Sequence, residues 1–273
     1  MIVFSKSGRG EVLFVFALCA VMCPQTSPKL PATAAPAIHP PTTNHRLPEG
    51  AVLHYKAEWH ALNAGVATLS VDSGKDDEVH LTGIANATGF VSHLYHVHDV
   101  FEANFTRSTF CSNLIHKHTE EGSRRRDETI RFDYAKKKSI RDELDMKNGR
   151  RMQMQNDIPP CATDVLSALW YVGSLPLAPG ATYSFPLNDG AKTAIINLAV
   201  EASEQVKTGA GTFNAIRVQP TSDSDLIKKR GKVWVWYSND AARLPVQIRG
   251  RMGWGTITMT LDRIERPAAA TGK

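Results

Sequence analysis

Apolar and polar residues alternate with a period of two along most of this 273-residue chain, and this pattern constrains the fold more than any other feature. The alternation is clearest at residues 53–60, 130–134, 194–198, 244–248 and 256–261. Successive side chains of a strand point to opposite faces, so the pattern is typical of strands with one buried face. We therefore expect an all-β domain of about twelve antiparallel strands.

One stretch, residues 162–172, has helical spacing of its apolar residues instead. Thr163 or Asp164 can cap the start of a helix there, and Gly173 can end it. A single helix between so many short strands is most simply packed against one sheet. The predicted fold is a strongly curved antiparallel sheet, or open half-barrel, with one packed α-helix.

Residues 233–237 (Val-Trp-Val-Trp-Tyr) are apolar at every position, which is unusual in this chain. A strand of this kind is typical of the centre of a sheet that is covered on both faces. We expect the helix to cover one face, and another layer or solvent-excluded space to cover the other.

The N-terminus has the layout of a secretory signal peptide, which we assign to residues 1–23. Basic residues precede an apolar run at 12–22, about half the roughly 20 residues needed to span a bilayer. A lipoprotein signal needs a small residue before the acylated cysteine, but Met22 precedes Cys23. The pattern indicates export to the periplasm, with neither a lipid anchor nor a transmembrane span in the mature chain.

Composition divides the rest of the chain into three parts. Residues 24–48 are rich in Pro, Ala and Thr, so we expect a disordered tether. Residues 49–266 form the predicted single all-β domain, and residues 267–273 a disordered tail. With 42% hydrophobic and 22% charged residues, the chain is ordinary for a globular protein, which excludes disorder throughout.

Two cysteines, Cys111 and Cys161, remain in the predicted mature domain. Two cysteines in an exported chain most often form a disulfide. A redox couple or a metal site is the alternative, but neither residue lies in a C-x-x-C motif.

Several motifs resemble the bacterial family called domain of unknown function 3108. Residues 234–240 (Trp-Val-Trp-Tyr-Ser-Asn-Asp) with Arg243 and Pro245 resemble its closing signature, and residues 92–99 and 158–169 match earlier motifs. The resemblance implies an exported protein without an agreed activity. Its layout is similar to that of periplasmic lipoprotein carriers and other half-barrel lipid-binding proteins, an analogy of fold that does not fix function.

Large aromatic side chains are the first candidate for a ligand site, because a curved sheet can enclose a lipid cavity. The candidates are Trp59, Trp170, Trp234, Trp236 and Trp254. The same side chains could equally fill a dry core.

Clusters of basic residues are expected at strand ends, where they could gather at one rim and hold an anionic head group. The main cluster is Arg124, Arg125 and Arg126, and further clusters lie at residues 136–138, 150–151 and 228–230. Solvated hairpin tips are the alternative interpretation.

Four histidines form a candidate zinc or copper site: His96, His98, His116 and His118. Within each pair the spacing of two places both imidazoles on one face of a strand, and a hairpin could bring His98 opposite His116 or His118. A solvated face of the hairpin is the alternative.

Two further motifs are given structural roles. Asp164 is expected to cap the helix, and Asp240 to bond turn amides while Arg243 pairs with it or with Glu58. The sequence contains no nucleotide-binding loop, G-x-S-x-G elbow or H-E-x-x-H helix, so we assign no catalytic residue and expect no cofactor.

These patterns favour a non-enzymatic envelope protein that binds a lipid or other amphiphile in the concave face of its sheet. A structural or assembly protein that binds another envelope protein is the first alternative, and a histidine-based metal-binding protein or enzyme is the second. Nothing in the sequence favours a nucleic-acid partner.

Overall fold

A computed structural model describes residues 36–42, 44–60, 62–222, 231–253 and 255–266. The predicted signal peptide, residues 24–35 of the predicted tether, Lys228–Arg230, Trp254 and the predicted tail lie outside these residues. The strands are β1 (Val52–Trp59), β2 (Leu62–Ser73), β3 (Glu78–Ala87), β4 (Val97–Thr106), β5 (Ser112–Glu121), β6 (Arg124–Asp133), β7 (Lys138–Asp145), β8 (Arg150–Asp157), β9 (Thr182–Asn188), β10 (Thr193–Thr208), β11 (Gly211–Ser222), β12 (Lys232–Ser238), β13 (Pro245–Met252) and β14 (Gly255–Glu265). The described helices are α1 (Gly89–Leu94) and α2 (Val165–Ser174).

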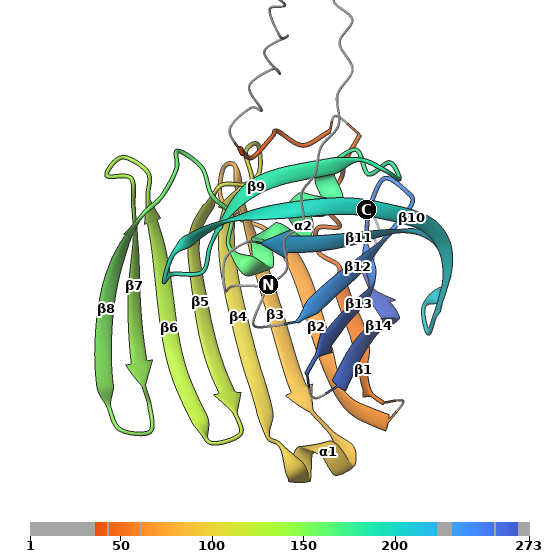
Figure 1. The fold of residues 1–273 in the computed structure, drawn as a ribbon, viewed down its shortest axis with the longest axis horizontal. Coiled ribbons are helices and arrows are strands. Elements are labelled where there is room, and N and C mark those ends of the chain that lie inside the picture. Colours follow the sequence, from red (N-terminus) through yellow and green to blue (C-terminus); the bar gives the residue numbers. More distant parts are fainter. Residues whose placement is uncertain (1–35, 43, 61, 223–230, 254, 267–273) are drawn as a thin grey trace, which may run out of the picture. The chain divides into compact units, whose positions relative to one another are not determined.

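All described strands belong to one antiparallel sheet in the order β8-β7-β6-β5-β4-β3-β2-β1-β14-β13-β12-β11-β10-β9. The expected all-β, open half-barrel fold is therefore confirmed, with 14 strands where we expected about twelve and two described helices where we expected one. Strands β1–β8 run alongside one another, and β9–β13 cross them (Figure 1). The edge strands β8 and β9 do not pair with each other in the described part of the chain, so the sheet remains open.

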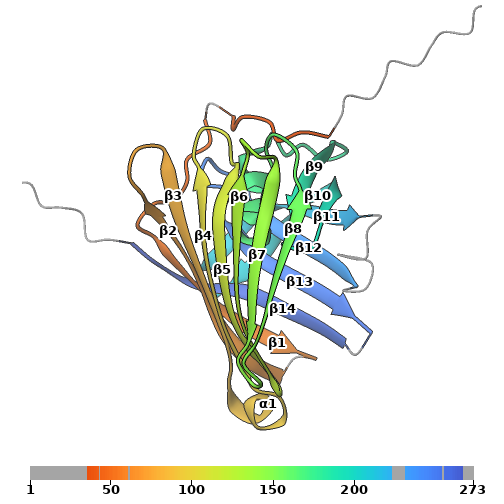
Figure 2. The same ribbon diagram turned by 90° about the vertical axis from the view of Figure 1, so that its left-hand side faces the viewer.

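Helix α2 lies between the two halves of the curved sheet, at the end that β9–β11 cross (Figures 1 and 2). Trp170 and Tyr171 are among the largest fully buried side chains, and Trp170 is only 1% exposed. Leu166 packs near Gly83 of β3, and the Tyr237 hydroxyl of β12 donates to the Leu169 carbonyl at 2.6 Å. The helix thus contacts both halves of the sheet, and we call the side of the sheet that faces it the concave face.

Asp164 is the N-cap of α2, as the sequence predicts. Its carboxylate accepts hydrogen bonds from the backbone amides of Leu166 and Ser167, from the Ser167 hydroxyl and from the Ser112 hydroxyl of β5. The residue is 1% exposed, so these bonds replace the water that a carboxylate requires. One side chain therefore caps the helix and fixes it to the sheet.

The predicted disulfide between Cys111 and Cys161 is present, with 5.1 Å between the two Cα atoms. It joins the turn between β4 and β5 to the segment that leads into α2. The backbone amide of Ser112 donates to the Ala162 carbonyl at 3.0 Å beside it. Covalent and hydrogen bonds therefore position the start of α2 together.

Packing against the domain begins before Glu49, within the segment that we expected to be a tether. Ile38 and Leu47 pack against the core, and the His39 amide donates to the Tyr171 hydroxyl at 3.1 Å. The Arg46 amide donates to the Ala241 carbonyl at 3.3 Å. These few apolar side chains and backbone bonds are enough to hold a proline-rich segment against the sheet.

His45 lies within this segment, and both of its ring nitrogens are buried without a hydrogen-bond partner in the described part of the chain. Its ring lies 6.4 Å from that of Phe110, centroid to centroid. Burial first, and the nearby Arg243 charge second, lower the pKa of His45 to about 4. The imidazole is therefore neutral in the folded protein at neutral pH.

We predict that Asp164→Ala lowers the free energy of unfolding by about 3 kcal/mol, because buried donors lose their acceptor. Asp145→Ala is the matched control, since Asp145 also accepts a backbone amide but is only half-buried at the end of β7, and its effect should be about 0.5 kcal/mol. Urea unfolding followed by circular dichroism measures both. Equal losses in the two variants would contradict the role given to Asp164.

A second prediction concerns acid stability. The pKa of His45 is about 4 in the folded chain, below its ordinary value of 6.5. The neutral imidazole therefore contributes its full stabilisation above pH 6.5, and this stabilisation is lost as the pH falls toward about 4. His45→Phe should remove this part of the pH dependence. Urea midpoints of parent and variant, compared at about pH 7.5 and about pH 4.5, measure it. Parallel pH profiles would show that His45 does not titrate in this way.

Candidate functional site

A groove lies on the outer face of the sheet, which is the side turned away from α2. Tyr237 reaches α2 from the concave face, so its neighbour Trp236 points outward, and Trp234 shares that direction. The groove has a volume of 820 Å³. We call it the outer groove; its lining residues are Glu58, His60, Glu201, Arg217, Trp234, Trp236, Arg249, Arg251, Thr256 and Thr258.

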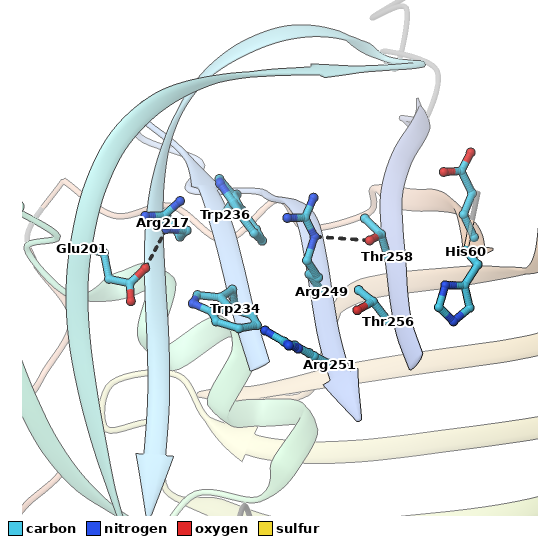
Figure 3. A pocket seen from close by; sticks show the side chains of 10 residues that line it. His60, Glu201, Arg217, Trp234, Trp236, Arg249, Arg251, Thr256 and Thr258 are labelled. Carbon is cyan, nitrogen blue, oxygen red and sulfur yellow. Dashed lines mark hydrogen bonds and ion pairs between the residues drawn. The ribbon is translucent and has the colours of Figure 1, made fainter. Parts of the chain in front are cut away.

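The long β10–β11 hairpin forms one wall of the outer groove (Figure 3). The pairing of these strands shifts between Val200 and Ala202, where Glu201 is left without a ladder partner. Such bulges bend strands. Beyond the bend the hairpin continues to its tip, where the Ala210 amide donates to the Leu261 carbonyl of β14 at 3.4 Å. Residues 233–237 therefore face α2 on one side and, on the other, the outer groove that this hairpin walls.

Trp236 is held rigidly at the base of the groove. Its indole Nε1 donates to Glu204 Oε1 at 2.5 Å, and the guanidinium carbons of Arg249 and Arg217 lie 5.2 and 6.0 Å from its ring centroid. Arg217 also pairs with Glu201 at 2.6 Å and with Glu204 at 3.0 Å. Since two carboxylates neutralise Arg217, its role is to hold the tryptophan in place.

Arg249 and Arg251 differ from Arg217 because neither pairs with a carboxylate in the described part of the chain. Arg249 Nε donates to the Thr258 hydroxyl at 3.3 Å, and Arg249 and Arg251 are both exposed. Lys232 of β12 lies directly opposite Arg251 in the ladder. Like charges in opposite positions destabilise a sheet. An anion bound between them would relieve this repulsion.

The structure separates the four described tryptophans that we proposed as one ligand site. Trp170 is buried in the core, Trp59 follows Glu58 and points to the concave face, and only Trp234 and Trp236 line the outer groove. Arginines Arg249 and Arg251 were missed by the sequence analysis. The available signal was that the two arginines are spaced two residues apart, as are the two tryptophans on the preceding predicted strand.

The arginines at the start of β6 do not gather at the groove. Arg124 is exposed, Arg125 pairs with Glu120 at 3.1 Å, and Arg126 pairs with Glu143 at 3.1 Å. Arg126 and Glu143 belong to a network of charges on the concave face that also contains Lys117, Glu128 and Arg141. The cluster that we expected to act together therefore divides between two faces of the sheet.

The four histidines lie near one another but do not converge on one point. His98 faces Glu120 across the ladder, and His116 faces Glu102, so the register differs from the one we expected. His98 Nδ1 lies 2.7 Å from Asn86 Oδ1, and His116 Nε2 lies 3.0 Å from Asp127 Oδ1. Among the described residues, no group of three or more His, Cys, Asp or Glu side chains is arranged to hold a metal ion.

These contacts change the acidity of the neighbouring carboxylates. Burial alone would raise the pKa of Asp127, but hydrogen bonds with His116 and His118 bring it below its ordinary value. A hydrogen bond with His96 similarly lowers the pKa of Glu120. The cluster is thus a network of histidines and carboxylates on the outer face of β4–β6.

Asp240 bonds the backbone amides of the turn before β13, as the sequence predicts. Asp240 Oδ1 accepts hydrogen bonds from the Ser238 hydroxyl and from the amides of Ala242 and Arg243. The Arg243 guanidinium donates to Asn239 Oδ1 at 2.8 Å, rather than pairing with Asp240 or Glu58. The Pro245 carbonyl accepts from the buried Tyr55 hydroxyl at 2.8 Å.

None of the described helices is long and apolar enough to cross a membrane. Among solved structures, the chain resembles a β-barrel-like protein of domain of unknown function DUF1849 from Brucella abortus. That likeness has a TM-score of 0.56 and 8% identity, and it covers 81% of this chain and 98% of the other. A protein with a YmcC-like fold from Bacteroides fragilis matches with a TM-score of 0.33 and 13% identity, over 81% of this chain and 98% of the other.

No curated protein matches the sequence. The model of the family described as "Protein of unknown function (DUF3108)" matches residues 54–262, which include β2–β13 and both described helices. The match confirms the resemblance noted in the sequence motifs. The chain therefore belongs to the DUF3108 family.

Proposed function

We propose that the protein is a non-catalytic binding protein that holds an anionic amphiphile in its outer groove. One observation carries the proposal: Trp234 and Trp236 meet Arg249 and Arg251, which have no carboxylate partner in the described chain, in a single groove of 820 Å³. We further infer that the protein acts in the periplasm, because its N-terminal sequence has the pattern of a secretory signal.

The two kinds of side chain divide the work of recognition. The half-buried Trp234 ring supplies apolar surface for an acyl chain or another hydrophobic group. Trp236 is only 4% exposed and is fixed by Glu204, so it forms the base of the groove and little order is lost on binding. The guanidinium groups of Arg249 and Arg251 supply donors for a phosphate, sulfate or carboxylate.

The packing of the core favours a ligand site on the outer face of the sheet rather than on the concave face, where we first expected it. Helix α2 occupies the concave side, and Trp170 there is buried against the sheet. An acyl chain on the part of the concave face that α2 covers would have to displace this helix and break its contacts with β5 and β12. The outer groove needs no such rearrangement.

We predict that dodecyl phosphate binds the protein and that neutral dodecyl maltoside binds at least tenfold more weakly, with both kept below their micelle concentrations. The double variant Arg249→Gln, Arg251→Gln should lose at least tenfold in affinity for dodecyl phosphate, because charge-assisted hydrogen bonds contribute about 1.5–3 kcal/mol. Isothermal titration calorimetry measures all three affinities.

Arg131→Gln is the matched control, because Arg131 is an exposed strand arginine on β6 with one carboxylate partner, Asp142, at 3.0 Å. Its affinity for dodecyl phosphate should equal that of the parent. Absence of binding by the parent, equal affinity for both detergents, or an unchanged Arg249/Arg251 variant would each refute the proposal.

A further inference from the structure

Helix α1 presents large apolar side chains to solvent at one end of the sheet. Phe90 is 71% exposed, Leu94 62% and Tyr95 51%, and Leu62 at the start of β2 is 56% exposed. The helix lies against β2, where the Thr88 amide donates to the Ala64 carbonyl at 3.0 Å. We call Leu62, Phe90, Leu94 and Tyr95 the apolar tip.

The fold itself gives no reason for this helix to be apolar. None of the residues of α1 is buried, whereas eight residues of α2 are buried in the core. A helix of six residues is too short to be stable alone in water. A polar loop could join β3 to β4 at this position without exposing three large apolar side chains. Exposed apolar groups of this kind mark sites of interaction.

Basic side chains lie at the same end of the sheet as the apolar tip. The turns between β5 and β6 and between β7 and β8 lie at this end, with α1 (Figures 1 and 2). Four exposed basic side chains at this end form no ion pair in the described part of the chain. They are Arg124, Lys147, Arg150 and Arg151, which we call the basic rim. The carboxylates beside them are Glu121 and Asp145, so the positive charges are in excess.

We propose that the apolar tip and basic rim dock the protein on an anionic lipid membrane. Charge complementarity selects this partner: the rim lies on anionic head groups while Phe90, Leu94 and Tyr95 enter the interface. Helix α1, which carries the tip, projects from the end of the sheet (Figure 1). The proposal does not rest on the function given to the outer groove.

The opposite end of the same strands provides an internal comparison. The turn between β6 and β7 carries Lys136 and Lys137, and Lys136 pairs with Asp133 at 2.8 Å. No exposed large apolar side chain lies in that turn. Basic side chains are therefore present at both ends of the strands. At the α1 end they occur together with an exposed apolar helix.

Vesicle flotation tests the proposal directly. The purified protein should float with vesicles of equal parts phosphatidylglycerol and phosphatidylcholine, and less with phosphatidylcholine alone. Phe90→Glu with Leu94→Glu should reduce the bound fraction of protein at least tenfold. Ile195→Glu, which changes an apolar side chain 39% exposed on β10, is the matched control and should bind as the parent does.

A second pair of variants separates the basic rim from general positive charge. Arg150→Gln with Arg151→Gln should weaken binding to the anionic vesicles several-fold, whereas Lys136→Gln with Lys137→Gln should not. Circular dichroism and urea midpoints confirm that each variant folds. Arg249→Gln with Arg251→Gln should retain vesicle binding, which distinguishes failure of this proposal from failure of the outer groove.

Three results would overturn the proposal. The first is no preference of the parent for anionic vesicles. The second is equal binding by the parent and the Phe90/Leu94 variant, or equal losses at the two ends of the strands. The third is a dimer, formed without vesicles and dissociated by the Phe90/Leu94 variant, which would assign the apolar tip to a second copy of the chain.

Discussion

Burial of helix α2 against one face of a single open sheet is the constraint on which the rest of the structure depends. A sheet of 14 strands that does not close needs something to cover its apolar concave face. The Asp164 carboxylate ties the start of the helix to Ser112 of β5, and Tyr237 of β12 bonds its middle. Strands far apart in the sheet order are therefore held by one helix.

This arrangement also supports the position that we propose for a ligand. Helix α2 takes up the part of the concave face next to β3, β4 and β12, and on the outer face the β10–β11 hairpin bends until its tip reaches β14 (Figure 3). The bend creates a wall beside Trp234 and Trp236 that a flat sheet would lack. Arg217, fixed by two carboxylates, completes the support of Trp236, while Arg249 and Arg251 are left with donors to offer.

Period and turn composition were sufficient to predict the strands, the open half-barrel and the helix that begins after Asp164. Helix α1 was missed because six residues following Thr88, which makes no side-chain capping bond, carry too little pattern. The register of β4 and β5 was also beyond prediction, since a shift of two residues preserves the alternation while it changes which residue faces His98.

The candidate site was predicted less well, and residues 233–237 explain why. Alternation places Trp234 and Trp236 on one face, but a strand that is apolar on both faces does not reveal which face is concave. The β10–β11 hairpin bends at Glu201, and its tip then meets β14 through residues 210 and 261, which are distant in sequence. Such long-range contacts leave little trace in local patterns.

The central claim is that an anionic amphiphile binds beside Trp234 and Trp236 on the outer face and leaves the core around Trp170 undisturbed. Nuclear magnetic resonance of the indole N–H groups during titration with dodecyl phosphate tests it most directly, once the signals are assigned by single substitutions. The account predicts large shifts for Trp234 and Trp236 and none for Trp170. A shift of Trp170 with the other two unmoved would place the ligand on the concave face and contradict it.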